Sequence, residues 1–343
     1  MPHAARPTVT LHDVAAAAGV SVSTASRVLS GSTRKVAPEY EARVLAAAEA
    51  LRYTADAAAR AMRRAGDAIA LVADDLTTPS IGMMVAAMER EARTAGAFVT
   101  VSSTMGVPDR QLDTIRVLRA LRPRALVLTS GHFMADELEG RLGAELSSYE
   151  REGGRAVIVG ETETPFPSIG FDNYRAAQSM GAFLAETGHR RVAIFGGAGD
   201  LRNMSDRTAG FVDGLQAGGV DPRDVRTISC AVSRDGGFEA ARRLAEEGMD
   251  GRQAVVAAND IIAIGALSGF RAAGVDVPGD VSVTGIDDIP LARDLTPRLT
   301  TMALPLAHAG AEAIRLALSG TETGGRLCLQ GHLIVRESTR PRR

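Results

Sequence analysis

The sequence predicts a protein of two parts, an all-α headpiece over about residues 1–52 and an α/β body over residues 67–343. Three observations support this division. Only short helical patterns occur up to residue 65. From Ala68 onward, short apolar runs alternate with amphipathic stretches, a pattern typical of βαβ units with parallel strands. Residues 1–65 hold nine Arg and Lys against five Asp and Glu, a net charge of +4 in a chain of net charge −2. A basic headpiece favours a polyanionic partner for that part alone.

Three short helices are predicted in the headpiece, over about Leu11–Ala18, Val22–Leu29 and Pro38–Leu51. Thr10 and Asp13 have the spacing of a capping box at the start of the first helix. Gly19 ends that helix by allowing a left-handed backbone, and Ser21 is a good N-cap for the second. Pro38 is acceptable in the first turn of the third.

The first two helices, joined through a glycine turn, predict a helix-turn-helix motif. The outward face of the second helix combines short hydroxyls, a methyl-bearing side chain and a guanidinium, on Val22, Ser23, Thr24, Ser26 and Arg27. Val22 can meet a thymine methyl group, and Arg27 can reach a guanine or a phosphate. The alternative is a small packing module with a solvated polar face.

The apolar runs of the body predict strands at Ile69–Ala73, Phe98–Ser102, Ala125–Thr129, Val157–Val159, Val192–Phe195, Ala254–Ala258 and Val281–Ile286. The stretches between them predict helices at Ile81–Thr94, Asp109–Ala120, Arg175–Glu186, Thr208–Ala217, Gly237–Glu247 and Ile261–Ala273. About 275 residues is long for one parallel sheet, so two α/β lobes are expected. The Pro165–Pro167 segment is the expected first crossing between them.

The stretch Thr10–Leu29 closely resembles the headpiece of the lactose-repressor/galactose-repressor (LacI/GalR) family. Further motifs follow in family order, at Val36–Glu39, Asn259–Leu267, Pro278–Asp288, Leu299–Thr301 and Val335–Thr339. Each motif alone is moderately specific, but the ordered set spans nearly the whole chain and is highly specific.

This resemblance implies that residues 53–66 form a hinge helix on DNA, in which an apolar side chain enters the minor groove and kinks the duplex. Met62 stands at the position of that side chain. The chain departs from the family at Ala55, Asp56 and Ala58, so a merely flexible tether is the alternative. The residues expected to contact DNA are Thr10, Val22, Ser23, Thr24, Ser26, Arg27, Ala59 and Met62.

The resemblance also implies a body like the periplasmic sugar-binding proteins, with two lobes that close over a small effector. The first lobe is expected over about 67–172 and 304–331, and the second over about 173–303 and 332–340. Candidate effector-binding residues stand at strand ends and helix starts. They are Asp74, Ser80, Thr129, Glu161, Asp172, Asn203, Arg207, Asn259 and Asp287, and Ser102 and Ser130 are further candidates in the first lobe.

A guanidinium, carboxylates and an amide suit the adjacent hydroxyls of a sugar or a sugar-like molecule. The alternative for Asp172, Asn259 and Asp287 is helix capping, because all three stand where N-caps stand. Aromatic residues make up only 4% of the chain. Phe133, Phe166 or Phe171 are the rings that could stack on an effector.

The sequence carries no pattern of an enzyme. It has no G-x-S-x-G and no P-loop, and its one lysine is Lys35. The glycines that begin at Gly196 lack the third glycine of a dinucleotide loop, since Arg202 stands there. The histidines and cysteines have no metal-ligand spacing. We therefore expect no catalytic residue, no cofactor and no metal.

These observations and the resemblance predict a DNA-binding transcriptional regulator, and specifically a repressor, controlled by a sugar or a related metabolite. A homodimer on a pseudo-palindromic double-stranded operator is expected, because one headpiece buries too little surface. Ile81–Arg93 is a candidate interface helix or a core helix. No signal peptide, no apolar run of 18 residues and only two cysteines indicate a cytoplasmic protein without membrane contact.

Three other functions remain open at this point. An effector-independent DNA binder of the same family would keep its DNA affinity across many metabolites. A solute-binding protein would be found in the periplasm. A sugar-modifying enzyme would turn over its bound sugar.

Overall fold

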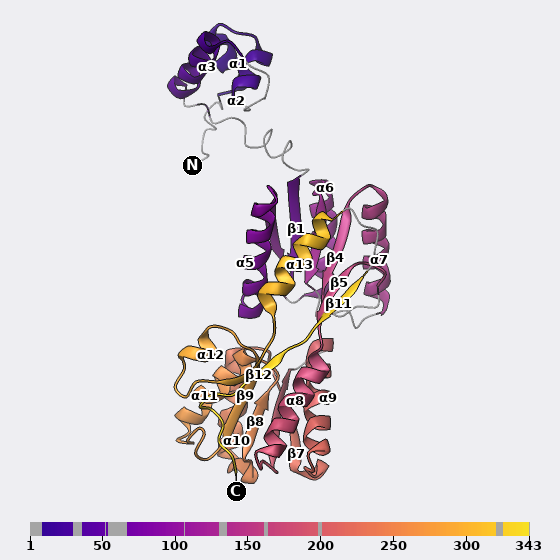
Figure 1. Ribbon diagram of the computed structural model, residues 1–343, viewed down its shortest axis with the longest axis vertical. Coiled ribbons are helices and arrows are strands. Elements are labelled where there is room, and N and C mark those ends of the chain that lie inside the picture. The colour runs from indigo at the N-terminus through magenta and orange to yellow at the C-terminus, as the bar shows by residue number, and fades with distance from the viewer. Residues whose placement is uncertain are drawn as a thin grey trace, which may run out of the picture. The chain divides into compact units, whose positions relative to one another are not determined.

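The computed structural model describes residues 9–29, 36–51, 53, 67–105, 107–129, 136–160, 164–197, 201–319 and 325–342 (Figure 1). The chain divides into two compact units, Met1–Gly66 and Asp67–Arg343. The expected hinge, with Ala59 and Met62, lies outside the described residues.

The three headpiece helices form where the sequence predicts them, as α1 (Leu11–Ala18), α2 (Val22–Leu29) and α3 (Pro38–Ala50). The predicted capping box is confirmed, because the Thr10 hydroxyl accepts from the Asp13 N–H and the Asp13 carboxylate accepts from the Thr10 N–H at 2.7 Å. Gly19 ends α1 with a φ of 62°. The Ser21 hydroxyl accepts from the Thr24 N–H at 3.1 Å and so caps α2.

The headpiece core consists of small side chains, Val14, Ala15, Ala18, Ala25 and Val44. Leu45, the residue that follows Val44 on α3, does not belong to it. Its side chain is 51% exposed, because adjacent residues on a helix point about 100° apart.

The first lobe of the body is built on a six-stranded parallel sheet with the order β11-β5-β4-β3-β1-β2. Its strands are β1 (Ala68–Ala73), β2 (Phe98–Ser103), β3 (Ala125–Thr129), β4 (Arg155–Val159), β5 (Ser168–Phe171) and β11 (Arg326–Leu329). Its helices are α5 (Pro79–Thr94), α6 (Pro108–Ala120), α7 (Asp136–Arg151) and α13 (Leu306–Leu318). Helices α5 and α13 pack on one face of the sheet, and α6 and α7 pack on the other.

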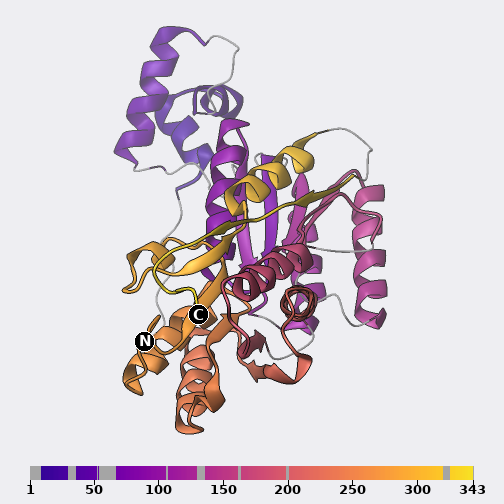
Figure 2. The same ribbon diagram turned by 60° about the horizontal axis from the view of Figure 1, so that its bottom comes forward.

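The second lobe has the sheet order β12-β10-β9-β8-β6-β7, in which only the pairing of β12 with β10 is antiparallel. Its strands are β6 (Val192–Gly197), β7 (Val225–Cys230), β8 (Ala254–Ala257), β9 (Ser282–Asp287), β10 (Thr300–Ala303) and β12 (His332–Ile334). Its helices are α8 (Asn173–Glu186), α9 (Arg202–Ala217), α10 (Arg234–Glu246), α11 (Asp260–Ala272) and the short α12 (Leu291–Asp294). Helices α8 and α9 lie side by side over one face (Figure 2), and α10 and α11 cover the other.

The chain passes between the lobes three times, from β5 to α8, from β10 to α13 and from β11 to β12. The expectation that Pro165–Pro167 forms the first crossing was wrong. That segment leads into β5, which pairs with β4 in the same sheet, so the chain leaves the first lobe only after Phe171.

Each predicted strand and helix of the body is present, with shifts of a few residues at its ends. The predicted elements omitted the strands β5, β7, β10, β11 and β12 and the helices α7, α12 and α13. Strand β7 lies at a sheet edge and is partly exposed, so it lacks a continuous apolar run. Helix α7 begins with the polar sequence DELEGR, which conceals its apolar stripe.

Close packing of α10 against α11 depends on glycine. A Cβ at Gly265 would lie 1.9 Å from the carbonyl oxygen of Arg234, so we expect Gly265→Ala to separate the two helices and to lower the melting temperature. Overpacking of this kind costs about 1–3 kcal/mol. Gly140→Ala on α7 is the matched control, because nothing lies within 4 Å of its added Cβ. Equal melting temperatures for the two variants, measured by circular dichroism, would contradict this account of the helix contact.

Candidate effector site and DNA-reading face

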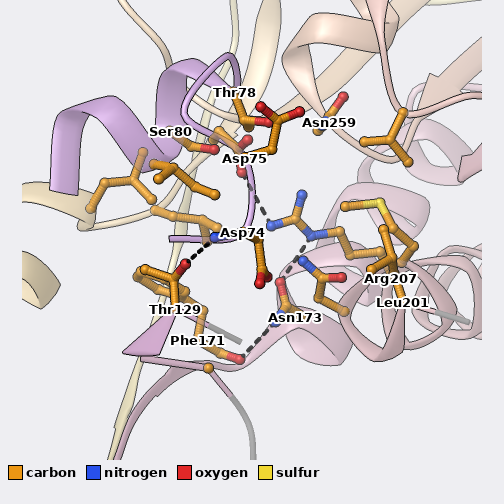
Figure 3. A pocket seen from close by; sticks show the side chains of 18 of the residues that line it. Asp74, Asp75, Thr78, Ser80, Thr129, Phe171, Asn173, Leu201, Arg207 and Asn259 are labelled. Atoms are coloured by element: carbon orange, nitrogen blue, oxygen red, sulfur yellow. Dashed lines mark hydrogen bonds and ion pairs between the residues drawn. The ribbon is translucent and has the colours of Figure 1, made fainter. Parts of the chain in front are cut away.

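A cavity of about 440 Å³ lies in the body, where the carboxyl ends of the strands of both lobes meet. This is the location at which parallel α/β sheets bind ligands. Its volume falls within the range of small-molecule sites. Figure 3 shows that the polar side chains around it come from both lobes.

Three predicted residues of the first lobe line this cavity, Asp74, Ser80 and Thr129. Asp74 directly follows β1, Thr129 ends β3, and Ser80 stands in the first turn of α5. The Thr129 hydroxyl accepts from the Asp74 N–H at 3.0 Å, which fixes the start of the loop after β1 (Figure 3).

Arg207 is the most constrained polar side chain of the cavity. Arg207 as a whole residue is only 4% exposed. Nε donates to Asn173 Oδ1 at 2.9 Å, and Nη1 donates to the Ala258 carbonyl at 2.8 Å. Nη2 donates to Asp287 Oδ1 at 3.1 Å. The planar fork is therefore held on three sides, which presets it for directional hydrogen bonding.

Asp287 is the last residue of β9, and its carboxylate forms a buried ion pair with Arg207 at the cavity. Burial raises the pKa of its carboxyl group, whereas the Arg207 guanidinium and the Ser80 hydroxyl that bonds to it favour the charged form. Because Ser80 belongs to the first lobe and Asp287 to the second, this contact joins the two lobes at the cavity.

The remaining predicted residues divide into two groups. Asn259 and Asn203 line the cavity. Asn259 also caps α11 by accepting from the Ile262 N–H at 3.0 Å, so the capping alternative and the site position coincide there. The buried Oδ1 of Asn203 has no hydrogen-bond partner within the described parts of the chain.

Asp172 is not among the residues that line the cavity. Its carboxylate caps α8 by accepting from the Arg175 N–H at 3.0 Å, and it accepts from Gln330 Nε2 at 3.1 Å. These contacts fit the capping alternative for this residue. Ser102 is likewise absent from the lining. Glu161 and Ser130 lie outside the described residues.

Four polar residues of the lining were not predicted from the sequence, namely Asp75, Thr78, Asn173 and Arg202. Asn173 immediately follows Asp172 after β5, so the strand-end signal was present and was assigned one residue too early. Among the aromatic candidates, Phe171 lines the cavity. Phe166 instead lies in the core of the first lobe, on the face of the sheet that α6 and α7 cover.

Helix α2 exposes the face that the sequence assigns to DNA. Val22, Ser23 and Arg27 are exposed, and Thr24 and Ser26 are half-buried. The Thr24 hydroxyl shares a 2.8 Å hydrogen bond with Ser21. The Thr10 hydroxyl lies 2.7 Å from the Asp13 carboxylate.

Within the described residues, no group of three His, Cys, Asp or Glu side chains could hold a metal ion. The same residues contain no helix of the length and apolarity that a membrane crossing requires.

Comparison with known proteins agrees with both parts of the structure. Residues 10–56 match the family described as "Bacterial regulatory proteins, lacI family", and residues 182–339 match the "Periplasmic binding protein-like domain". The transcriptional regulator CelR of Thermobifida fusca is 33% identical to this chain. The match covers 96% of this chain and 98% of CelR.

Two solved structures extend the comparison. The Lac repressor dimer bound to operator and the anti-inducer ONPF has a TM-score of 0.81 and 25% identity, over 97% of this chain and 99% of that one. A CelR–cellobiose complex has a TM-score of 0.67 and 29% identity, over 97% of this chain and 100% of that one.

A helix-turn-helix headpiece and a two-lobed α/β body with a polar cavity define a DNA-binding regulator with a small-molecule site. The chain belongs to the LacI family of bacterial regulatory proteins. It is accordingly a transcriptional regulator and not an enzyme.

Proposed function

We propose that this regulator is a repressor whose homodimer binds a pseudo-palindromic operator, and that a small effector in the cavity changes its affinity for that operator. The three-way anchoring of Arg207, at a cavity lined by both lobes, is the observation that carries this proposal. The similarity to the Lac repressor dimer bound to operator supports the DNA partner and the dimer. A protein of this kind works in the cytoplasm.

We propose further that the effector is an uncharged sugar or a sugar-like molecule. Hydroxyls, amides and a fixed guanidinium can bind adjacent hydroxyl groups. Asp74, Asp75 and Asp287 outnumber Arg202 and Arg207 around the cavity, so a phosphate or carboxylate would meet a surplus of negative charge. The CelR–cellobiose complex shows that a similar fold accepts a neutral disaccharide.

The test has two steps. Selection of randomised duplex DNA should enrich a pseudo-palindrome, which then serves as the operator probe. Calorimetric titration with glucose, galactose, ribose, cellobiose and glucose 6-phosphate should find a neutral sugar that binds and that also changes operator affinity. Binding of glucose 6-phosphate alone would contradict the charge argument, and operator affinity unchanged by every bound sugar would indicate an effector-independent DNA binder.

Arg27 is expected to contact the DNA backbone or a base from the exposed face of α2. If the contact is to a phosphate, Arg27→Ala should weaken operator binding and lower the salt dependence by about one phosphate equivalent. Arg27→Lys is the control, since it keeps the charge and should keep the slope. Loss of base preference with an unchanged slope would indicate a base contact, and unchanged binding by both variants would remove Arg27 from the interface.

The dimer interface is a separate proposal. In the predicted interface helix, now within α5, Met84 and Met88 are buried in the core, so the core alternative holds for them. Exposed apolar side chains instead occur on the edge strand β2 and on or next to α6, including Phe98, Val117 and Leu121. We propose that a second copy of the chain covers this surface.

Charge placed on that surface should prevent association. Val117→Glu with Leu121→Glu is expected to give monomers in analytical ultracentrifugation and to weaken operator binding. Leu291→Glu is the control, because Leu291 is a comparably exposed leucine on the second lobe. A dimer that survives the double substitution would place the interface elsewhere.

A further inference from the structure

The turn that follows β9 holds two consecutive residues in backbone conformations that L-amino acids rarely adopt. Asp287 has a φ of 125°, and Asp288 has a φ of 54°. Such conformations persist only where surrounding contacts maintain them. Asp287 lines the cavity, but Asp288 does not. Contacts outside the cavity must therefore help to hold this turn.

Three such contacts are present. Arg336 Nη2 donates to Asp288 Oδ1 at 2.6 Å, and Arg293 Nη2 donates to Asp288 Oδ2 at 2.7 Å. The Ile289 N–H donates to Asp260 Oδ2 at 2.9 Å. The side chains of Asp288 and Arg336 are 6% and 12% exposed, whereas that of Arg293 is 62% exposed. Water screens the Arg293 pair, so Arg336 is the stronger constraint on Asp288.

Arg336 is itself fixed independently of the cavity. Its side-chain Nη1 donates to the Leu299 carbonyl at 2.8 Å, and its backbone N–H donates to the Thr300 hydroxyl at 2.9 Å. Both partners stand at the start of β10. Arg336 closely follows β12, the strand formed after the chain has returned from the first lobe. A rigid sheet edge therefore supports the guanidinium.

We propose that Arg336 is a positioning residue for effector binding. Without lining the cavity, it holds Asp288 and so maintains the turn that aims Asp287 at Arg207 and at the effector. This proposal rests on the proposed function in one respect, that the cavity is the effector site. If the Asp288–Arg336 pair is lost, the turn can relax toward ordinary backbone angles, and the Asp287 carboxylate leaves its place in the cavity wall.

The first measurement needs no effector. Hydrogen exchange followed by mass spectrometry should show at least tenfold faster exchange over residues 286–290 in Arg336→Gln, with α11 and α13 unchanged. Asp288→Asn should act alike, and the double variant should add nothing further, because both substitutions remove the same pair. Arg336→Lys should restore part of the protection. Arg298→Gln is the control, since it breaks an exposed ion pair with Glu337 on the same sheet edge.

The second measurement titrates these variants with glucose, galactose, ribose and cellobiose. The sugar that binds the wild-type protein should bind Arg336→Gln at least tenfold more weakly and Arg298→Gln with unchanged affinity. A looser turn with unchanged sugar affinity would overturn the positioning role and leave the proposed function intact. Unchanged exchange at the turn, or faster exchange throughout the second lobe, would overturn it even if none of these sugars binds.

Discussion

Arg207→Ala is expected to abolish effector binding while operator binding without effector stays close to that of the wild-type protein. The substitution removes the guanidinium and with it the hydrogen bonds to Asn173, Ala258 and Asp287. The charged contact with Asp287 and the order of three neighbours are lost together, so the loss of affinity should reach at least 100-fold. The headpiece belongs to the other compact unit and keeps its own core.

Loss of Arg207 also leaves Asp287 as a buried carboxylate without its main partner. Removal of one member of a buried ion pair costs about 3–5 kcal/mol, so Arg207→Ala could fail through instability alone. Arg207→Lys separates the two effects, because it keeps the charge beside Asp287 and loses the fork. We expect this variant to fold normally and to bind the effector at least tenfold more weakly.

Arg175→Ala serves as the matched control for both variants. Arg175 is an arginine on the neighbouring helix α8, its side chain is 75% exposed, and its ion pair is with Asp172, away from the cavity lining. Calorimetry gives effector affinity and fluorescence anisotropy gives operator affinity. Normal effector binding by a folded Arg207→Lys protein would refute the cavity as the effector site.

The second large effect concerns the dependence of stability on pH. Two buried groups of the second lobe, Asp260 and His189, are expected to oppose one another between about pH 4 and pH 7. Each one alone would produce a slope of up to about 1.4 kcal/mol per pH unit. In the wild-type protein the two slopes largely cancel. Substitution of either group alone should therefore expose the pH dependence that the other group contributes.

Asp260 begins α11 and is completely buried. Burial and the nearby Asp287 raise the pKa of its carboxyl to about 7, against the partial opposition of the Thr301 hydroxyl. The folded protein therefore holds a proton that the unfolded chain releases near pH 4. This contribution to stability is complete below pH 4 and is lost as the pH rises through 7.

His189 behaves in the opposite way. Burial lowers its pKa to about 4, with smaller contributions from the nearby cations Arg342 and Arg190, although the Leu184 carbonyl favours the charged form. The ring also lies 2.9 Å from the Ser282 hydroxyl. The folded protein keeps the ring neutral, whereas the unfolded chain binds a proton below about pH 6.5. Stability is therefore lost as the pH falls from 6.5 to 4.

Melting temperatures measured from pH 4.5 to pH 7.5 test this opposition. Relative to the wild-type protein, Asp260→Asn should become more stable as the pH rises, because the amide mimics the protonated acid. His189→Gln should become relatively more stable as the pH falls. Arg298→Gln changes an exposed pair and should run parallel to the wild type over this range. Parallel curves for Asp260→Asn or His189→Gln would mean that the substituted group has an ordinary pKa.

Local signals in the sequence determined the headpiece almost completely. Thr10 with Asp13, Gly19, Ser21 and Pro38 act within one helical turn of their own positions, so the bounds of the three helices could be predicted from them. The same holds for the central strands of the body, whose continuous apolar runs reflect burial on both faces. These features need no knowledge of distant contacts.

Most of the residues that line the cavity could also be predicted from the sequence, because the strand ends of parallel sheets meet at one edge. Asp74, Thr129, Asn259 and Asp287 were found in this way. The position of a strand end predicts a lining residue only to within about one residue, since neighbouring side chains on an extended chain point in opposite directions. It therefore selected Asp172, which caps a helix, and missed Asn173, which holds Arg207.

Only the tertiary structure decided which partners these side chains have. Asn173 and Arg207 are 34 positions apart, Arg207 and Asp287 are 80 apart, and Asp288 and Arg336 are 48 apart. No local pattern encodes such pairs, because side chains that meet across a sheet edge leave no periodic signal along the chain. The shifted pKa values of Asp260 and His189 have the same origin. They depend on burial and on charges that folding brings near, and these exist only once the second lobe has folded.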